Sequence, residues 1–195
     1  NNHNGDVGLA KQMIVSAKSS GADCVKFQMR NLEEVYRRKS LEGDGDDLGT
    51  EYVIDLLSKF ELTTEEHFEL SRFCKDLGIA YMCTPWDPVS ADVIETFGVS
   101  AYKIASADLT NFPLIQHVAK YGKPIILSTG MSGFEEVTSV VNDLHRVKAN
   151  FILLHCNSTY PAPFRDINLK YINNLREVHD YVGYSGHERG VVVSL

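Results

Sequence analysis

The sequence predicts an α/β fold of the (β/α)8 TIM-barrel type, and two observations carry that prediction. Short, nearly continuous apolar runs alternate with amphipathic helical patterns along the chain, which indicates a parallel sheet covered by helices. Almost every run also ends in Lys, Ser, Thr or His, and such residues at the carboxyl ends of successive strands are typical of a barrel's active-site face. An open doubly wound sheet shows the same alternation, but the uniform repeat of roughly 25–30 residues favours the barrel.

The apolar periodicity and the capping signals place the individual elements. Asp6 is the expected N-cap of the first helix, and Thr63 to Glu66 read as a capping box. Gly21, Gly78 and Gly98 are expected to end helices. The strands are predicted at 23–28, 79–84, 101–105, 124–128, 151–155 and 181–185, and the helices at 6–20, 51–59, 64–77, 88–97, 111–120, 133–147 and 168–179. Residues 31–50 are charged and rich in Gly and Asp, so they are expected to form a long exposed loop.

Six strands cannot close an eight-stranded barrel. Residue 1 lies in a polar loop, and the chain stops at residue 195 inside an apolar run. We therefore expect residues 1–195 to be a partial barrel that holds about strands two to seven, with the first and eighth strands outside it.

The composition and the net charge argue against some classes of function. With 195 residues, of which 44% are hydrophobic, the chain can bury a sizeable core. A formal net charge of −7 argues against a general nucleic-acid surface but not against an anionic small substrate in a locally basic pocket. No apolar stretch approaches the roughly 20 residues of a membrane span, so no membrane partner is expected.

The four cysteines, at 24, 74, 83 and 156, form no CxxC pair. Three of them lie in or beside predicted strands and one lies in a helix. This pattern favours buried, reduced thiols in a cytoplasmic protein over a disulfide framework.

Two lysines, Lys26 and Lys103, each lie inside an apolar strand. A buried ammonium is costly without a partner, so either the position is an exposed edge or the cation faces an anion. If both lysines point toward the mouth of a barrel, a phosphate or a carboxylate between them fits the chemistry.

Hydroxyl and glycine residues follow two of the strands, namely Ser106 after one and Ser128, Thr129 and Gly130 at the end of the next. A helical pattern follows Gly130, so an oxyanion could also meet a helix N-terminus there. Such residues often serve as ordinary caps and turns, but beside the two lysines they favour an anion site.

Two histidines lie at successive strand ends: His155 ends the strand at 151–155, and His187 follows the strand at 181–185. Each could be a hydrogen-bonded structural residue, and their spacing does not match a structural zinc site. Tyr160 lies in a stiff loop flanked by proline, where it could position a substrate or simply pack. The polar loop 1–5 could be a turn, or it could bind hydroxyl groups at the barrel mouth.

Taken together, these strings resemble the N-acetylneuraminate (sialic acid) synthase family, and the likeness spans almost the whole chain in the family's order. The matching pieces are Asn2-His3-Asn4-Gly5, Val25-Lys26-Phe27-Gln28, Thr84-Pro85, Tyr102-Lys103-Ile104-Ala105-Ser106, Gly122-Lys123-Pro124 through Ser128-Thr129-Gly130-Met131, His155-Cys156 with Tyr160-Pro161, and Gly183-Tyr184-Ser185-Gly186-His187-Glu188. The resemblance implies a (β/α)8 barrel followed by a small antifreeze-like domain, which we expect to lie outside residues 1–195. It also implies a homodimer of the full-length protein.

The resemblance further implies a role for each matching residue. Those expected to hold the phosphate and carboxylate of phosphoenolpyruvate are Lys26, Thr84, Lys103, Ser106, Ser128, Ser158 and Ser185. Tyr160 is expected against the substrates as a catalytic residue, and His3 and Asp108 toward the sugar.

His187 is expected to be both catalytic and one of two His ligands of a divalent metal, Mn²⁺ or Mg²⁺. By the same resemblance, the second His lies beyond Leu195 and an acidic residue lies ahead of Asn1. A sugar-binding Asn of some members has no clear counterpart, since Leu48 falls nearest to its position.

The implied reaction joins phosphoenolpyruvate to an N-acetylated amino sugar, N-acetylmannosamine or a related 2,4-diacetamido hexose, giving a nine-carbon 2-keto acid and phosphate. Two rival functions remain open. One is a Schiff-base aldolase with Lys26 or Lys103 as nucleophile, and the other is a non-catalytic sugar-phosphate binding protein.

Overall fold

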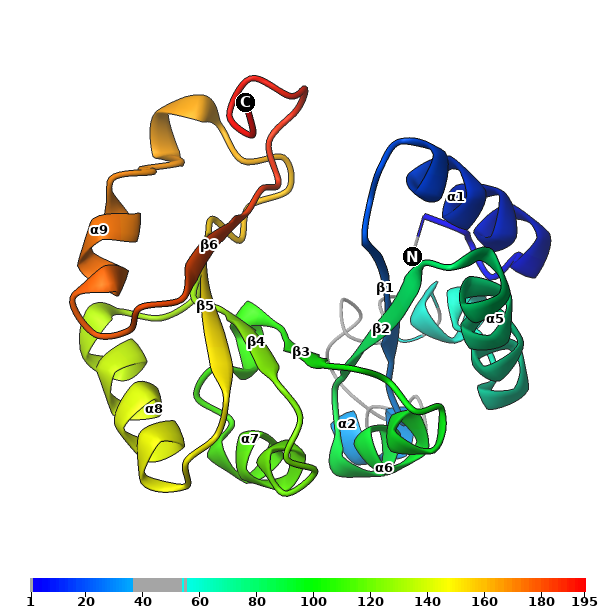
Figure 1. Ribbon diagram of the computed structural model, residues 1–195, viewed down its shortest axis with the longest axis horizontal. Helices are drawn as coiled ribbons and strands as arrows, with labels where there is room; N and C mark the ends of the chain where they lie inside the picture. The colour runs from blue at the N-terminus through cyan, green and yellow to red at the C-terminus, as the bar shows by residue number, and fades with distance from the viewer. Residues whose placement is uncertain (1, 37–53, 55) are drawn as a thin grey trace, which may run out of the picture. The chain divides into compact units, whose positions relative to one another are not determined.

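The computed structural model describes residues 2–36, 54 and 56–195 (Figure 1). The chain forms two compact units, Asn1–Ser100 and Ala101–Leu195, and each has its own parallel strands and helices. Both units follow the β–α order that the sequence predicts. No helix in the described part of the chain is long and apolar enough to cross a bilayer.

The first unit pairs β1 (Cys24–Met29) with β2 (Ala80–Pro85) in parallel. Its helices are α1 (Val7–Ser19), α2 (Leu32–Val35), α5 (Thr64–Leu77) and α6 (Pro88–Thr96), and 56–60 are also helical. The Asp6 side chain accepts from the Leu9 amide at the start of α1, as expected of its N-cap. Thr63 and Glu66 form the predicted capping box of α5, and Gly78 ends it at a φ of 72°.

The two faces of the β1–β2 pair carry different chemistry. Phe27 and Tyr81 stack at 5.4 Å between ring centroids on the side that contacts α1 and α5. Lys26 and Gln28 alternate with Phe27 and point to the other face, where Thr84 lies opposite Gln28 in the register. Lys26 is exposed there, whereas Thr84 is buried.

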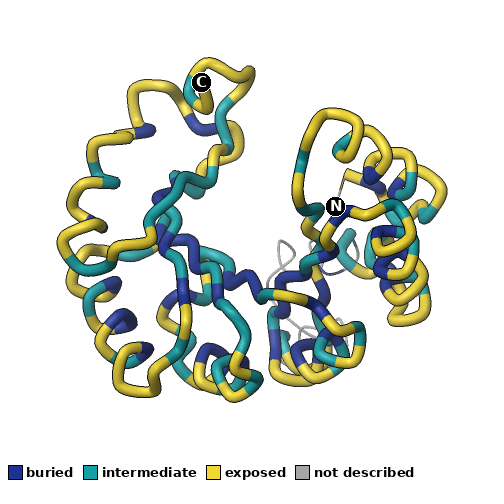
Figure 2. The backbone as a smooth tube through the Cα atoms, in the orientation of Figure 1, coloured by how far each residue is buried: buried dark blue, intermediate teal, exposed yellow. Residues whose placement is uncertain are grey.

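The second unit joins four parallel strands in chain order: β3 (Tyr102–Ile104), β4 (Ile125–Ser128), β5 (Phe151–Cys156) and β6 (Val182–Ser185). Its helices are α7 (Phe112–Ala119), α8 (Phe134–Arg146) and α9 (Tyr171–Arg176), with short 3₁₀ turns at Ser106–Asp108 and Phe164–Asp166. Figure 2 shows buried backbone in the middle of these strands and exposed backbone on the outer sides of the helices. Leu127 and Leu153 are fully buried, as is Val137 of α8, so the core lies between sheet and helices.

Most predicted boundaries agree with the structure to within one or two residues, but the helix predicted at 168–179 is shorter. The observed α9 spans Tyr171–Arg176. Asn168 adopts a left-handed φ of 50°, which cannot continue into a helix. No side chain caps the start of α9, because Lys170 stands at its N-cap. Much of the predicted loop 31–50, including Leu48, and part of the helix predicted at 51–59 lie outside the described residues.

All four cysteines are free, as the sequence predicts, and three of them are buried. Burial raises the pKa of the Cys74 thiol to about 11 and that of Cys83 to about 12. These thiols therefore stay protonated near neutral pH and behave as small apolar core residues.

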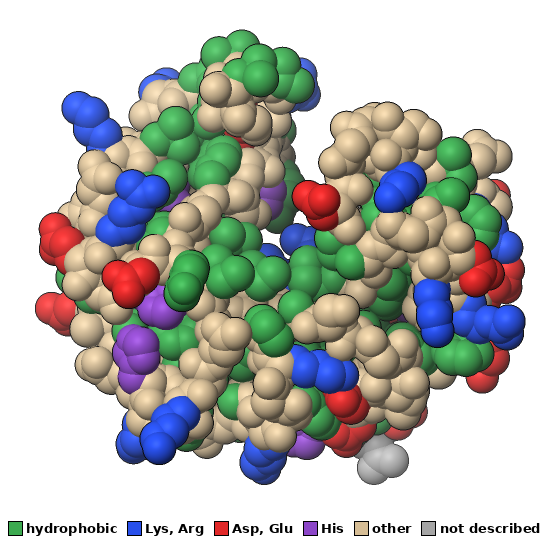
Figure 3. All heavy atoms as spheres, in the orientation of Figure 1, with side chains coloured by type: hydrophobic (Ala, Val, Ile, Leu, Met, Phe, Trp, Pro, Cys, Tyr) green, Lys and Arg blue, Asp and Glu red, His purple; other side chains and the backbone are tan. Residues whose placement is uncertain are grey.

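On the face that Figure 3 shows, acidic and basic side chains are interspersed and alternate with apolar and neutral ones. The expectation that the chain does not bind nucleic acid stays a prediction.

A buried histidine makes the first unit sensitive to acid. The Nδ1 atom of His67 lies 2.7 Å from the Tyr81 hydroxyl. Burial lowers the pKa of His67 to about 4 from its usual 6.5, and the nearby His3 lowers it further while Glu66 acts in the opposite direction. His67 therefore binds a proton near pH 6.5 in the unfolded chain but only near pH 4 in the folded chain.

We predict that the free energy of unfolding falls between pH 6.5 and 4 because of His67, by about 3 kcal/mol at most. His67→Gln keeps an amide near the Tyr81 hydroxyl but cannot titrate, so its stability should fall less steeply over that window. Urea unfolding of both proteins at several pH values measures the difference. Parallel curves for the two proteins would show that His67 does not cause the acid sensitivity.

Candidate functional site

A buried hydrogen bond in the second unit joins Lys103 to Ser128. Lys103 is only 3% exposed, and its ammonium donates to the Ser128 hydroxyl at 2.7 Å and to the Ile104 carbonyl at 2.5 Å. The register pairs Lys103 with Ile126, so Lys103 and Ser128 lie on the same face of neighbouring strands. Because the ammonium is hydrogen-bonded in the sheet, its charge is held at a fixed place near the carboxyl end of β4.

A glycine at the end of β4 brings two further serines close to this point. The Gly130 amide donates to the Ser106 hydroxyl at 3.1 Å. A Cβ atom at Gly130 would lie 2.6 Å from Ser158 Oγ and 2.8 Å from the Cys156 carbonyl oxygen, so no larger residue fits there without a shift. Ser158 Oγ is itself buried, and it has no hydrogen-bond partner among the described residues. An oxyanion could satisfy that hydroxyl.

Of these residues, Gly130 and Ser158 border a pocket at the carboxyl ends of β4 and β5, with a volume of about 520 Å³, whereas Lys103, Ser106 and Ser128 do not line it. Gly130, Met131 and Ser158 line it on one side, and Asp166 and Tyr171 line it on the other. The pocket is large enough for a small metabolite.

Tyr160 and His187 form a second pair in the same unit. Their rings stack at 4.0 Å, and the Tyr160 hydroxyl lies 2.9 Å from His187 Nε2. His187 Nδ1 lies 2.6 Å from the Asn157 carbonyl oxygen, which can only accept, so Nδ1 carries the proton and Nε2 accepts from Tyr160. Burial raises the pKa of Tyr160, which keeps its hydroxyl a donor at neutral pH.

Ser185 ends β6 opposite Cys156, on the same face as Ser128 in the register. The loop after it is held by the Tyr184 hydroxyl, which donates to Glu188 at 2.7 Å. A Cβ atom at Gly186 would lie 2.8 Å from this carboxylate, so a larger residue there would displace the Glu188 side chain. This bond fixes the short loop that carries His187.

The remaining candidates are placed as follows. His155 lies on the helix-covered face and bonds the Ile167 carbonyl at 2.5 Å, in keeping with its structural interpretation. His3 is buried beside Phe27, 5.9 Å between ring centroids, and accepts from the Gly5 amide. Asp108 accepts from the Asn111 side chain at 3.1 Å. Contact of His3 and Asp108 with a sugar stays a prediction.

Lys26 and Thr84 share one face of the first unit, and sequence reasoning missed the residues that surround that face. Arg30 donates to the Gln28 side chain at 2.8 Å and pairs with Glu61 at 3.0 Å, while its guanidinium lies 4.7 Å from the centre of the Trp86 ring. An arginine directly after an apolar strand is the signal that could have revealed this cluster. Joint binding of one anion by Lys26 and Lys103 stays a prediction.

His187 is the one residue that the sequence analysis proposes as a metal ligand. The described part of the chain holds no group of three His, Cys, Asp or Glu side chains that could bind an ion. His187 nevertheless suits a ligand, because its carbonyl partner fixes the tautomer in which Nε2 carries no proton, and Nε2 could coordinate an ion in exchange for its bond to Tyr160.

A family model and individual relatives both place the chain among the same group of synthases. The sequence model of the NeuB family matches residues 13–195. The chain is 39% identical over 201 residues to the N,N'-diacetyllegionaminic acid synthase of Campylobacter jejuni, covering all of this chain and 60% of that protein. It is 33% identical over 199 residues to the human N-acetylneuraminate-9-phosphate synthase, covering all of this chain and 55% of that protein.

A solved structure agrees with these sequence matches. The N-acetylneuraminic acid (sialic acid) synthetase of Leptospira borgpetersenii, solved in complex with citrate, superposes with a TM-score of 0.87 at 32% identity, over 98% of this chain and 64% of that one. The predicted fold class is thereby confirmed. The chain spans between about half and two thirds of the length of these relatives.

We predict that Gly130→Ala destabilises the protein, because the new methyl group would overlap Ser158 Oγ and the Cys156 carbonyl; overpacking of this kind costs about 1–3 kcal/mol. Gly133→Ser is the matched control, since a Cβ there meets nothing nearer than 3.8 Å and serine suits the N-cap of α8. Urea unfolding measures both variants. Equal stability of Gly130→Ala and wild type would mean that the loop does not need glycine.

Proposed function

Because the chain belongs to the NeuB family, we propose that the full-length protein condenses phosphoenolpyruvate with an N-acetylated amino sugar. The product would be a nine-carbon 2-keto sugar acid, with phosphate released. The observation that carries the proposal is the buried Lys103 ammonium held against Ser128, beside a loop with an unsatisfied Ser158 hydroxyl. The relatives, which are named as synthases of nonulosonic acids, support the same reaction.

The second unit supplies most of the proposed anion site. Lys103 would offset one negative charge of phosphoenolpyruvate, and Ser106, Ser128, Ser158 and Ser185 would donate to its oxygens. From the first unit, Lys26 and Thr84 are proposed to bind the same substrate. These charges persist from substrate to product, so the lysines chiefly bind and orient.

The proposed chemistry forms one bond between carbon atoms. C3 of phosphoenolpyruvate attacks the aldehyde carbon of the open-chain sugar, and the aldehyde oxygen becomes a hydroxyl after protonation. Water adds at C2 and loses one proton, which balances the proton taken up by the aldehyde oxygen. The C2–O bond to phosphate then breaks, and the C2 hydroxyl gives its proton to the departing phosphate to leave the ketone. Tyr160 would donate a hydrogen bond to the substrates, a role that suits its protonated hydroxyl.

A divalent metal, Mn²⁺ or Mg²⁺, is part of the proposal. His187 Nε2 would be one ligand, oriented through Nδ1 by the Asn157 carbonyl, and Tyr160 would move its hydrogen bond from Nε2 to the substrate. A bound metal would supply Lewis-acid polarisation of the aldehyde. A homodimer of the full-length protein, which rests on the resemblance, and a cytoplasmic location, which rests on the pattern of free cysteines, complete the proposal.

A Schiff-base aldolase is the alternative that Lys103 itself can test. Such a lysine must lose its proton to attack a carbonyl, whereas Lys103 donates to two oxygen acceptors in the sheet. Borohydride reduction in the presence of pyruvate should leave the full-length protein unlabelled. A covalent adduct at Lys26 or Lys103 would favour the aldolase.

The proposed reaction is tested by product mass. Full-length protein with a divalent metal is incubated with phosphoenolpyruvate and, separately, N-acetylmannosamine, its 6-phosphate and a 2,4-diacetamido hexose. One of them should yield a nine-carbon 2-keto acid with an equal amount of phosphate. No product with any of these sugars would contradict the proposed function.

We predict that Lys103→Met in the full-length enzyme raises the Michaelis constant for phosphoenolpyruvate by at least about tenfold, through loss of a charge-assisted contact. Lys120→Met, on an exposed lysine after α7, is the control and should match the wild type. Steady-state kinetics measures all three proteins. An unchanged Michaelis constant in Lys103→Met would place phosphoenolpyruvate elsewhere.

We predict that His187→Ala nearly abolishes turnover and weakens Mn²⁺ binding, while phosphoenolpyruvate still binds through the lysines and serines. Titration calorimetry with Mn²⁺ and with phosphoenolpyruvate separates the two effects. Normal metal affinity and a normal rate in the variant would show that His187 serves only to anchor the loop through Asn157.

A further inference from the structure

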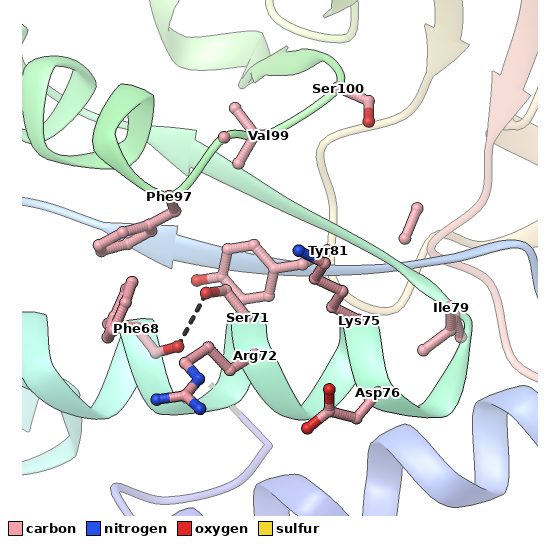
Figure 4. A pocket seen from close by; sticks show the side chains of 12 residues that line it. Phe68, Ser71, Arg72, Lys75, Asp76, Ile79, Tyr81, Phe97, Val99 and Ser100 are labelled. Atoms are coloured by element: carbon pink, nitrogen blue, oxygen red, sulfur yellow. Dashed lines mark hydrogen bonds between the residues drawn. The ribbon is translucent and has the colours of Figure 1, made fainter.

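A pocket of about 560 Å³ lies in the first unit, between α5 and the segment that follows α6 (Figure 4). Ile79 and Ala80 border it where β2 begins, and 98–100 border it after α6. Thr84 lies at the other end of the same strand, about 13 Å from Ala80 at roughly 3.3 Å per residue. The pocket is therefore separate from the site proposed at the carboxyl ends of the strands.

One side of this pocket is aromatic and apolar. The Phe68 and Phe97 rings lie 5.8 Å apart and are tilted by 48°, and Phe97 meets the Tyr81 ring edge-on at 6.4 Å. Buried Ile79 and Val99 extend the apolar surface. Phe68 remains 46% exposed, so part of its ring is available to a ligand. A flat ring is the group that would bury this surface most completely.

The other side of the pocket is charged. Arg72, Lys75 and Asp76 follow Phe68 along α5 and line the same opening (Figure 4). Within the described ranges, neither the Arg72 guanidinium nor the Lys75 ammonium has a carboxylate within 4.0 Å. In a chain with a net charge of −7, two cations without an ion pair at the edge of one pocket favour an anion.

The neighbouring hydroxyl groups are already engaged. Ser71 donates to the Phe68 carbonyl at 2.8 Å, and the Tyr81 hydroxyl lies 2.7 Å from His67 Nδ1. These two hydroxyls are engaged within the protein, so they contribute little hydrogen bonding to a ligand. Recognition of an anion therefore falls to Arg72 and Lys75, one turn apart on one face of α5.

We propose that this pocket binds a small molecule in which a planar ring is joined to an anionic group. The ring would lie on Phe68 and Phe97, and the phosphate or carboxylate would be bound by Arg72 and Lys75. Asp76 would accept from a hydroxyl or amino group beside the ring. A nucleoside monophosphate and an aromatic carboxylate both have this chemistry, and the proposal does not depend on the function proposed above.

Titration calorimetry with the full-length protein tests the site with defined probes. Adenosine monophosphate and benzoate each combine ring and anion. Adenosine and inorganic phosphate are the two halves of the first probe, and benzamide and acetate stand for the ring and the carboxylate of the second. At least one combined probe should bind at least about tenfold more tightly than either half, and the probe that does so identifies the anion as phosphate or carboxylate. Absence of binding by both combined probes would overturn the proposal.

Variants and competition locate the binding site. Arg72→Gln with Lys75→Gln should weaken the bound probe at least about tenfold, Phe68→Leu should weaken it through loss of ring stacking, and Lys120→Gln should leave it unchanged. Excess phosphoenolpyruvate should not displace the probe. Displacement by phosphoenolpyruvate, or full affinity in the double variant, would overturn the assignment to this pocket.

Discussion

The buried ammonium of Lys103 is the constraint on which the rest of the second unit depends. A charge that is 3% exposed must be hydrogen-bonded, and Ser128 and the Ile104 carbonyl meet that need. Those partners require β3 and β4 to pair in the observed register, with Lys103 and Ser128 on one face. The other face carries Tyr102, Ile104 and Leu127, which are fully buried in the core. One strand thus contributes to the core on one face and to a candidate anion site on the other.

The loops that follow β4 and β5 bring the candidate site residues close together. Gly130 allows the β4 loop to approach the β5 loop so closely that Ser158 comes within 2.6 Å of where a Cβ would stand. The Asn157 carbonyl, from the same β5 loop, fixes the His187 ring, which in turn stacks on Tyr160. The two loops and the segment after β6 therefore share contacts, and a shift of one would move a predicted substrate or metal contact on another.

Much of this architecture could be predicted from sequence because it follows from local rules. Asp6, Thr63 and Gly78 mark helix ends through hydrogen bonds and φ angles that depend on a few neighbouring residues. The length of α9 could not be predicted, because a left-handed Asn168 interrupts an otherwise helical pattern. The Arg30–Glu61 ion pair could not be predicted either, because it joins residues far apart in the chain. Strand periodicity placed the polar residues at strand ends, but only tertiary contacts show that Ser158 lacks a partner and that His187 bonds Asn157.

The central claim is that Lys103 and Ser128 hold an anionic substrate, and a crystal structure of the full-length protein with phosphoenolpyruvate tests it most directly. The account predicts a phosphate or carboxylate oxygen within about 3.2 Å of Lys103 Nζ, with Ser158 Oγ bonded to the same molecule. Phosphoenolpyruvate bound away from Lys103, with no oxygen of the substrate within hydrogen-bond distance of the ammonium, would contradict it.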